Sequence, residues 1–141
     1  MFDFGANVST TTHVDGTDIG STKTYESNGV ELAITNAIKV FDGANDATGK
    51  SALKLGTSSV VGTFTFTVGA DVDKVIIYVA KYKAKDTQIT INDGTAQTIS
   101  TSSDSGEYTA IEIDTTTTKT ITVATVSGKY RAMIDKIEFV Y

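Results

Sequence analysis

The sequence contains no cysteine, no proline and no tryptophan, and it has a single histidine, His13. The absence of cysteine excludes disulfide bonds, thiol catalysis and cysteine-ligated zinc. A Ser-His-Asp triad would need His13, which lies in a polar stretch rich in Thr, Ser and Gly. Because several site components would have to converge on that stretch, we expect His13 to be a surface residue.

Long apolar runs and an excess of basic residues are also missing. No run approaches the roughly 20 residues of a transmembrane helix, which excludes membrane insertion through a helix. Twelve basic residues are scattered among seventeen acidic ones, for a net charge of -5, which argues against a nucleic acid partner. With 40% hydrophobic and 21% charged residues, the 141-residue chain is predicted to form a single globular domain over residues 1–141.

Threonine is abundant and often alternates with apolar residues. The range 62–68 places Phe64, Phe66 and Val68 on one face of a strand and Thr63, Thr65 and Thr67 on the other. β-Branched hydroxyl side chains suit the solvent face of a sheet. Glycines stand at apparent turns, so the sequence predicts an all-β domain.

The range 73–83 is the most apolar strand. Val75, Ile77 and Val79 fall on one face, while Ile76, Tyr78, Ala80 and Tyr82 fall on the other. Apolar residues on both faces predict a strand that is covered on both sides and lies in the interior of a sheet.

Two hairpins are predicted. Asn28-Gly29 suits a type I′ turn and pairs Tyr25 with Leu32, Glu26 with Glu31 and Ser27 with Val30. In the range 88–99, a two-residue turn would pair Ile89 with Thr98. A three-residue turn with Gly94 in the left-handed conformation would pair Ile89 with Ile99 and keep both inside, and we prefer it.

The range 30–41 fits either a helix or a strand, and its Ile and Val content favours a strand. Residues 42–50 are predicted to be a loop, whose Asp and Asn spacing suggests an Asx-rich turn more than a calcium loop. Further strands are predicted over 2–4, 51–56, 107–113, 119–126 and 130–141. About nine or ten strands at this spacing predict a sandwich or a barrel.

Two aromatic positions are candidates for ligand binding. Tyr78 and Tyr82 share one face roughly 13 Å apart, and a row of tyrosines can stack on sugar rings. For Tyr78 we favour the alternative that it packs in the core, and for Tyr82 the alternative that it only ends the strand stays open. Lys81, Lys83 and Lys85 suit sugar hydroxyls or an anionic group, or they protect the strand end from aggregation.

Tyr130 and Arg131 form a second candidate, because a planar donor group beside an aromatic ring is a common recognition pair. A structural ion pair is the favoured alternative for Arg131. No catalytic constellation is present in the sequence, so we do not expect an enzyme.

The closing range 132–139 reads Ala-Met-Ile-Asp-Lys-Ile-Glu-Phe and resembles the last strand of jelly-roll, galactose-binding-like domains, which include several families of carbohydrate-binding modules. Residues 49–56 and 62–66 resemble β-sandwich domains appended to large secreted bacterial proteins. The resemblance implies an antiparallel jelly-roll sandwich of about 8–10 strands. It further implies a non-catalytic module, extracellular or at the cell surface and part of a larger protein or assembly, that binds a glycan or another protein.

On this basis, Lys81, Tyr82, Lys83, Tyr130 and Arg131 are the predicted ligand-binding residues. The alternative is a structural or assembly domain, such as a surface-protein stalk, an adhesion module, or a decoration or fibre domain of a phage virion. Tyr82 and Tyr130 in one groove would favour the glycan, whereas a flat apolar patch would favour assembly.

No cofactor is expected apart from one candidate metal. The resemblance implies a structural calcium near Asp3 and Asp135, although the first strand lacks the Glu-x-Glu pattern common in such modules. Strict alternation would place Asp135 on the same face of the strand as Met133 and Ile137. An Asp135 side chain that points inward needs a partner, a bulge or a metal.

Overall fold

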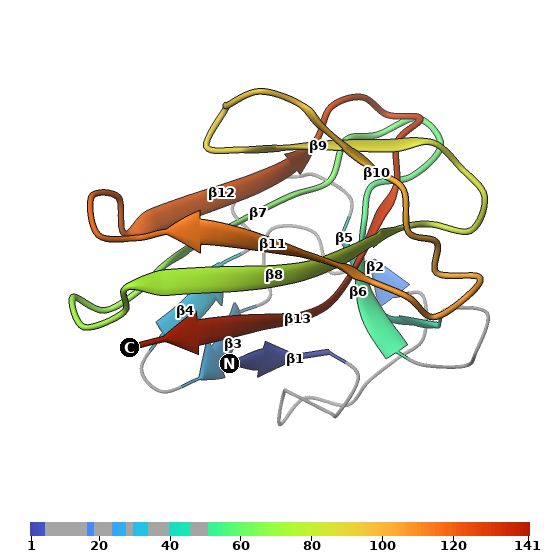
Figure 1. The fold of residues 1–141 in the computed structure, drawn as a ribbon. Helices are drawn as coiled ribbons and strands as arrows, with labels where there is room; N and C mark the ends of the chain where they lie inside the picture. The colour runs from blue at the N-terminus through green and yellow to red at the C-terminus, as the bar shows by residue number, and fades with distance from the viewer. Residues whose placement is uncertain (5–16, 19–23, 28–29, 34–39, 46–50) are drawn as a thin grey trace.

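The computed structural model describes residues 1–4, 17–18, 24–27, 30–33, 40–45 and 51–141. These residues form two β-sheets packed face to face, and none of them is helical (Figure 1). Every pair of named strands is antiparallel, which confirms the predicted all-β sandwich. The part of the chain that the structure describes holds no helix that is long and apolar enough to cross a membrane.

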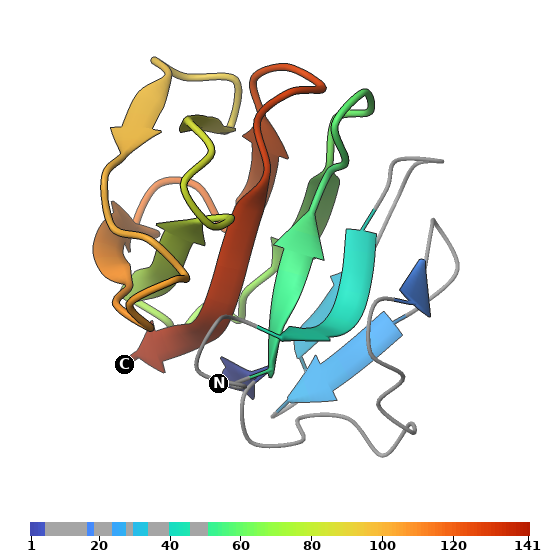
Figure 2. The ribbon, with the colours of Figure 1, turned by 90° about the vertical axis from the view of Figure 1, so that its right-hand side faces the viewer.

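The first sheet has seven strands, of which six form one continuous order and the seventh, β1, pairs with β13. Figure 2 shows β13, β6 and β5 of this sheet side by side. The continuous order is β11 (Thr109–Asp114), β8 (Lys74–Lys81), β13 (Ala132–Val140), β6 (Ser51–Leu55), β5 (Val40–Asn45) and β2 (Thr17–Asp18), and β1 is Phe2–Asp3.

The second sheet has six strands, and the chain crosses repeatedly between the two sheets from β6 onward. Its order is β10 (Gln97–Ile99), β9 (Thr87–Ile91), β12 (Thr120–Thr125), β7 (Thr63–Thr67), β4 (Val30–Ala33) and β3 (Thr24–Ser27). The total exceeds the predicted 8–10 strands partly because β1 and β2 have only two residues each.

β8 lies in the interior of the first sheet, paired with β11 on one side and β13 on the other, as predicted. Val75, Ile77 and Val79 are fully buried between the sheets. The prediction of apolar cover on both faces is wrong, because Ile76 and Tyr78 on the outer face are only partly buried. Polar side chains of the flanking strands, such as Glu112 and Glu138, lie opposite Ile76 instead.

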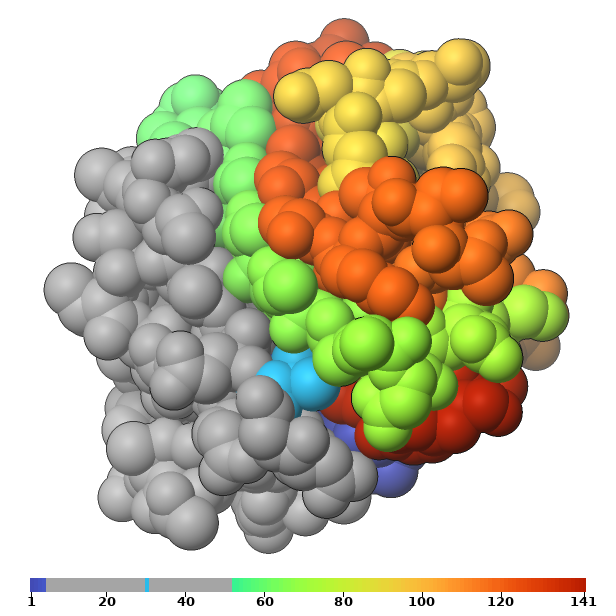
Figure 3. All heavy atoms as spheres, turned by 90° about the vertical axis from the view of Figure 1, so that its left-hand side faces the viewer, coloured from blue at the N-terminus to red at the C-terminus, as the bar shows by residue number. Residues whose placement is uncertain are grey.

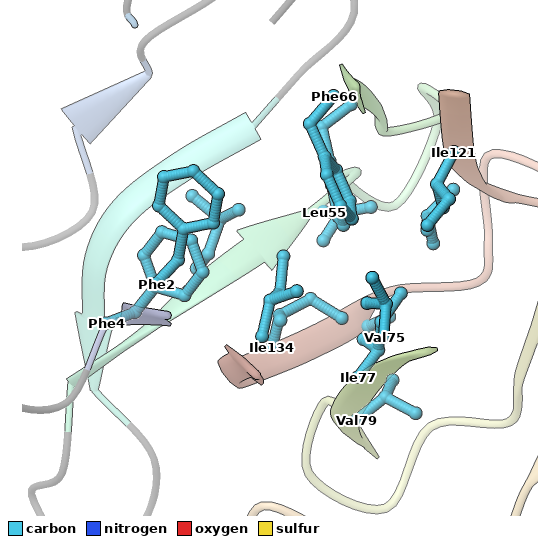
Figure 4. Packing of buried hydrophobic residues seen from close by; sticks show 14 of the residues in the cluster. Phe2, Phe4, Leu55, Phe66, Val75, Ile77, Val79, Ile121 and Ile134 are labelled. Atoms are coloured by element: carbon cyan, nitrogen blue, oxygen red, sulfur yellow. The ribbon is translucent and has the colours of Figure 1, made fainter. Parts of the chain in front are cut away.

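The core lies between the sheets and combines residues from both (Figure 4). Phe2 and Phe4 point inward as predicted, and the Phe2 ring packs edge-on against Phe66 of the second sheet at 6.3 Å between centroids. Each large apolar side chain buried in this way stabilises the fold by about 1.5–3 kcal/mol. The N-terminal segment is therefore part of the core.

The threonines of β7 and β12 explain why this residue is so abundant. Cross-strand hydroxyl pairs join Thr65 to Thr122 and Thr67 to Thr120, each at 2.9 Å. Such pairs stabilise neighbouring strands on the outer face of a sheet. Thr63 departs from the predicted pattern, because it is buried.

The first predicted hairpin has the expected register, with Tyr25 opposite Leu32 and Ser27 opposite Val30. The turn residues 28–29 lie outside the described residues. The predicted strand over 30–41 is wrong as a single element, because its first residues form β4 in the second sheet and its last residues belong to β5 in the first.

The predicted loop over 42–50 is also wrong at its start, since β5 continues to Asn45. Its remaining residues, 46–50, lie outside the described residues, and so does His13. Pairing with different neighbouring strands thus decides where β4 ends and β5 begins, and periodicity along the chain does not carry that information.

The second hairpin differs from both predicted registers, because Ile89 pairs with Gln97 and Thr87 pairs with Ile99. The left-handed positions are Asn92 (φ 50°) and Asp93 (φ 55°), in place of Gly94. Asn92 accepts this conformation while its side chain pairs with β12, accepting from the Thr122 N–H at 2.7 Å. Ile89 and Ile99 are nevertheless both buried, because the register differs from the preferred one by two residues and side-chain faces repeat every two.

β13 contains a β-bulge between Ile134 and Lys136, where its register against β8 shifts by one residue. Of the three predicted explanations for Asp135, the structure therefore shows a bulge. Met133 lies opposite Ala80 on the outer face, whereas Ile137 lies opposite Ile77 and points into the core. The extra residue thus places two residues of the same parity on opposite faces of the sheet.

Candidate functional site

The predicted binding residues lie where β8 ends and β13 begins, at the right-hand end of Figure 1. The last ladder pair joins Lys81 to Ala132. The pairing continues one step further, because the Tyr82 N–H donates to the Arg131 carbonyl at 3.0 Å. Two segments that are distant in sequence, 81–85 and 129–131, are thereby brought together.

The loop over 100–106 holds the backbone of Lys83 from two sides. The Lys83 N–H donates to the Ser103 hydroxyl at 2.8 Å, and the Ser102 hydroxyl donates to the Lys83 carbonyl at 2.7 Å. Lys83 has a φ of 54°, a left-handed conformation that costs a non-glycine residue about 1–3 kcal/mol. This conformation fixes the direction in which the exposed Lys83 side chain leaves the backbone.

The Tyr82 side chain packs against two buried apolar residues, Ala52 and Met133, on the outer face of the first sheet. Three cationic groups lie over the ring, at 4.8 Å from its centroid for Lys54 Nζ, 4.9 Å for Arg131 Cζ and 5.3 Å for Lys83 Nζ. Cation–π attraction at a partly exposed ring is worth about 0.5–1 kcal/mol per pair. Tyr82 therefore gathers cations from three segments of the chain.

Arg131 is fixed by its backbone and by its side chain. Its carbonyl accepts hydrogen bonds from the Tyr82 N–H and from the Thr87 hydroxyl, the latter at 2.6 Å. The ion pair that the sequence favoured for Arg131 is not found among the described residues, and the guanidinium lies over Tyr82 instead. Its Nε is buried and has no hydrogen-bond partner in the described part of the chain.

Tyr130 lines a separate cavity of about 200 Å³ together with Lys85, Asp86 and Lys129. The segment enters this position from a turn in which the Tyr130 N–H donates to the Ser127 carbonyl at 3.0 Å. Lys129 Nζ lies 5.1 Å from the centroid of the Tyr130 ring. The cavity thus combines an aromatic ring, two ammonium donors and one carboxylate acceptor.

The basic residues are unevenly distributed over the molecule. Lys74 and Lys136 form salt bridges elsewhere. Lys119, in the turn before β12, donates to the carbonyls of Ala70 and Val72 in the turn before β8, and the two turns lie side by side in Figure 3. The other described basic residues all belong to the end just described: Lys54, Lys81, Lys83, Lys85, Lys129 and Arg131. This end is cationic although the whole chain carries a net charge of -5.

Tyr78, the other member of the predicted tyrosine row, has different surroundings. It lies on the outer face, so its predicted place in the core is wrong, and its hydroxyl donates to Glu138 at 2.9 Å. Lys136 Nζ forms a salt bridge with Glu138 at 2.6 Å and lies 4.3 Å from the Tyr78 ring centroid. Hydrogen bonds from Lys136 and Tyr78 lower the pKa of Glu138, and the bond to Glu138 raises the pKa of Tyr78 and that of Lys136.

The two residues predicted near a calcium ion lie on neighbouring strands. Asp3 pairs with Lys136, and the Phe4 N–H donates to the Asp135 carbonyl at 2.9 Å. The described residues contain no group of three or more His, Asp or Glu side chains that could hold a metal. The calcium site remains a prediction from the resemblance.

The structure therefore places the five predicted residues at one end of the sandwich but divides them between two features. Tyr82, Lys83 and Arg131 form one cluster, Tyr130 lines the cavity, and Lys81 occupies the last ladder position of β8. Tyr82 is not among the described residues that line the cavity at Tyr130, so the single groove with both tyrosines, which would have favoured a glycan, is not found in the described part of the chain.

Sequence reasoning missed three participants: Lys54, Asp86 and Lys129. The alternation of Lys54 with Leu53 and Leu55 predicts that it points outward, but its proximity to Tyr82 follows from the pairing of β6 with β13. Asp86 and Lys129 carry no local signal, because the cavity forms only when their two turns meet.

Comparisons with known proteins give a fold likeness and no family. No protein-family model and no curated protein matches the chain. An exo-β-1,3-galactanase from Phanerochaete chrysosporium, solved with β-1,3-galactotriose, aligns at 15% identity and a TM-score of 0.45, over 91% of this chain and 29% of the galactanase chain. The carbohydrate-binding module TmCBM61, solved with β-1,4-galactotriose, aligns at 18% identity and a TM-score of 0.42, over 82% of this chain and 90% of that chain. At such low similarity, the ligand of this chain must be inferred from its own residues.

Proposed function

We propose that this domain is a non-catalytic carbohydrate-binding module whose ligand places one sugar ring in the cavity at Tyr130. The observation that carries the proposal is the composition of that cavity. Its volume of about 200 Å³ is smaller than the roughly 300 Å³ at which sites for drug-sized ligands begin. A single sugar ring, with more of the chain outside, suits this size.

The lining residues match the chemistry of a sugar. The face of the Tyr130 ring can pack on the C–H face of a pyranose, while Lys85 and Lys129 donate to hydroxyl oxygens and Asp86 accepts from a hydroxyl group. Lys81, Tyr82, Lys83 and Arg131 belong to the same two joined segments, 81–85 and 129–131, as the cavity residues Lys85, Lys129 and Tyr130. Among the described residues, three cations lie over the Tyr82 ring and one, Lys129, lies over the Tyr130 ring. We therefore assign the stacking role to Tyr130, the less covered ring, and assign to Tyr82 the positioning of the cations.

The same lining argues for binding without catalysis. Glycoside hydrolysis ordinarily uses a pair of carboxylates on the two sides of the scissile bond. Among the described residues that line the cavity, Asp86 is the one carboxylate. A binding module of this kind is expected at the cell surface or outside the cell, within a larger protein or assembly.

The alternative of an assembly domain has less support. A flat apolar contact surface would require neighbouring exposed hydrophobic residues. The large hydrophobic residues exposed in the described part of the chain are Met1, Val126, Val140 and Tyr141. Three of them lie where β1 meets the end of β13, which makes a small patch, and Val126 follows β12.

The proposal is tested with a glycan array, followed by titration calorimetry with the best ligand. Tyr130→Ala should weaken binding about 30-fold, because truncating an aromatic contact at the centre of a site costs about 2 kcal/mol or more. Tyr141→Ala, the same change at an exposed terminal tyrosine, is the matched control and should leave binding unchanged. An array without any bound glycan, or full affinity in Tyr130→Ala, would show that the proposal is wrong.

A further inference from the structure

We propose that the saccharide carries an anionic group, a carboxylate or a sulfate, which Arg131 and Lys83 bind beside the Tyr82 ring. The proposal rests on the proposed function, since it specifies the ligand that the Tyr130 cavity receives. It is carried by two observations on the described residues: the convergence of cations at the Tyr82 ring and the absence of salt bridges for Arg131 and Lys83.

The convergence of cations is electrostatically unfavourable without an anion. Arg131 Cζ and Lys83 Nζ both lie within 5.3 Å of one ring centroid, so the two charges are at most roughly 10 Å apart. Like charges at an exposed residue such as Lys83 repel weakly, and salt screens the repulsion, so a bound anion relieves it most at low ionic strength. The hydrogen bonds from Ser102 and to Ser103 nevertheless hold Lys83 in this place, in a left-handed conformation.

Two lysines elsewhere on the first sheet have a carboxylate partner. Lys74 pairs with Glu112 at 2.7 Å, and Lys136 pairs with Glu138 at 2.6 Å. In the part of the chain that the structure describes, Lys83 and Arg131 take part in no salt bridge. An anionic ligand would supply the missing counter-charge.

Arg131 provides the geometry for such a ligand. Its Nε is buried and without a hydrogen-bond partner among the described residues. Because Nε is buried, an external ligand would be bound by the other N–H groups of the guanidinium. Guanidinium groups bind carboxylate and sulfate through two parallel hydrogen bonds, so the pair recognises shape as well as charge.

The surrounding acids favour a saccharide over a nucleic acid. Asp86 lines the neighbouring cavity, and Asp104 lies in the loop that holds Lys83, so a ligand with a charge on every unit would be repelled. The net charge of -5 acts in the same direction. A sugar chain with an anionic group beside a neutral ring fits both features.

The test uses calorimetry with three probes at low salt: a hexuronate oligosaccharide, the same oligosaccharide with its carboxylates reduced to alcohols, and a sulfated neutral oligosaccharide. We expect an anionic probe to bind at least tenfold more tightly than the reduced one, because charged hydrogen bonds are worth about that factor, and we expect salt to reduce the difference. The carboxylate and sulfate probes distinguish the two anionic groups.

Arg131→Gln and, separately, Lys83→Gln should each reduce the preference for the anionic probe about tenfold. Lys74→Gln removes the same charge at the opposite end of β8 and should preserve it. Equal binding of the anionic and reduced probes would overturn this inference and leave the proposed function standing. Failure of all three probes would overturn this inference, whereas the proposed function is decided separately by the glycan array. Equally tight binding of a single-stranded DNA oligonucleotide would show general polyanion binding and also overturn the inference.

Discussion

Tyr78 and Tyr82 lie four residues apart on the same outer face, yet they differ in whether the cations beside the ring have a carboxylate partner. At Tyr78, the hydroxyl and the nearby Lys136 both bind Glu138, so the cation, the ring and the carboxylate satisfy one another. At Tyr82, cations approach the ring from three segments, and two of them have no salt bridge in the described part of the chain. The first tyrosine is part of a charge-paired cluster on the sheet, whereas the second belongs to the surface for which we propose an anionic ligand.

The largest expected effect comes from the glycines that support the Tyr82 end. A Cβ added at Gly62 would lie 2.2 Å from the Gly56 nitrogen, and a Cβ at Gly56 would approach the Tyr130 carbonyl at 3.2 Å. We expect Gly62→Ala to lower the unfolding free energy by about 3 kcal/mol, because the backbone must move apart. It should also weaken sugar binding, since the displaced backbone adjoins Tyr130.

Urea unfolding measures this effect, and Gly69→Ala is its control. The Cβ at Gly69 would contact only the exposed Asp71 side chain, which can rotate away, so a small change is expected. A Gly62→Ala variant as stable as the wild type would contradict the close approach of the Gly56 and Gly62 backbones.

An intermediate effect separates the two tyrosines directly. Tyr78→Phe removes the hydrogen bond to Glu138 and should lower the unfolding free energy by about 1 kcal/mol while sugar binding is retained. Tyr82→Phe keeps the ring that holds the cations, so it should change neither property appreciably. Thermal unfolding and calorimetry measure both, and loss of binding in Tyr78→Phe would mean that the two regions act as one site.

The smallest effect is a pH dependence confined to the Tyr78 region. Because hydrogen bonds from Lys136 and Tyr78 lower the pKa of Glu138 in the folded state, its contribution to stability is fully present above the unfolded value of about 4.3. The contribution is lost as pH falls below that value through the folded pKa. For a surface group it amounts to a few tenths of a kcal/mol.

The measurement compares the wild type with Glu138→Gln in urea at pH 7 and pH 3. The stability difference between the two proteins should shrink at the lower pH, because protonation of the wild-type carboxyl progressively removes the charge that Lys136 and Tyr78 bind. A difference that stays constant between the two pH values would contradict the role of the Glu138 charge.

The sequence predicted the strands of the sandwich best where burial alone determines them. The inward residues Phe64, Phe66 and Val68 are buried, and β8 lies inside a sheet, because alternation encodes which face meets the core. The register of the 88–99 hairpin was wrong, because Asn92 takes its left-handed conformation to bind β12, a strand that follows much later in the chain.

The candidate site was predictable only in part for a similar reason. Tyr82 and Arg131 stand out as recognition residues in the sequence, and the structure places them together. The approach of Lys54 to the Tyr82 ring depends on the pairing of β6 with β13. That Tyr130 lines a cavity without Tyr82 depends on how two turns meet. Neither property is encoded by local periodicity.

The bulge at Asp135 also has a consequence for folding fidelity. A regularly alternating strand can slide by two residues along its neighbour and still present apolar side chains to the core. In β13 the alternation changes phase between Ile134 and Lys136, so a slide would place the phase change against the wrong residues of β8. The bulge therefore allows one alignment of β13, and that alignment sets Arg131 beside Tyr82 each time the chain folds.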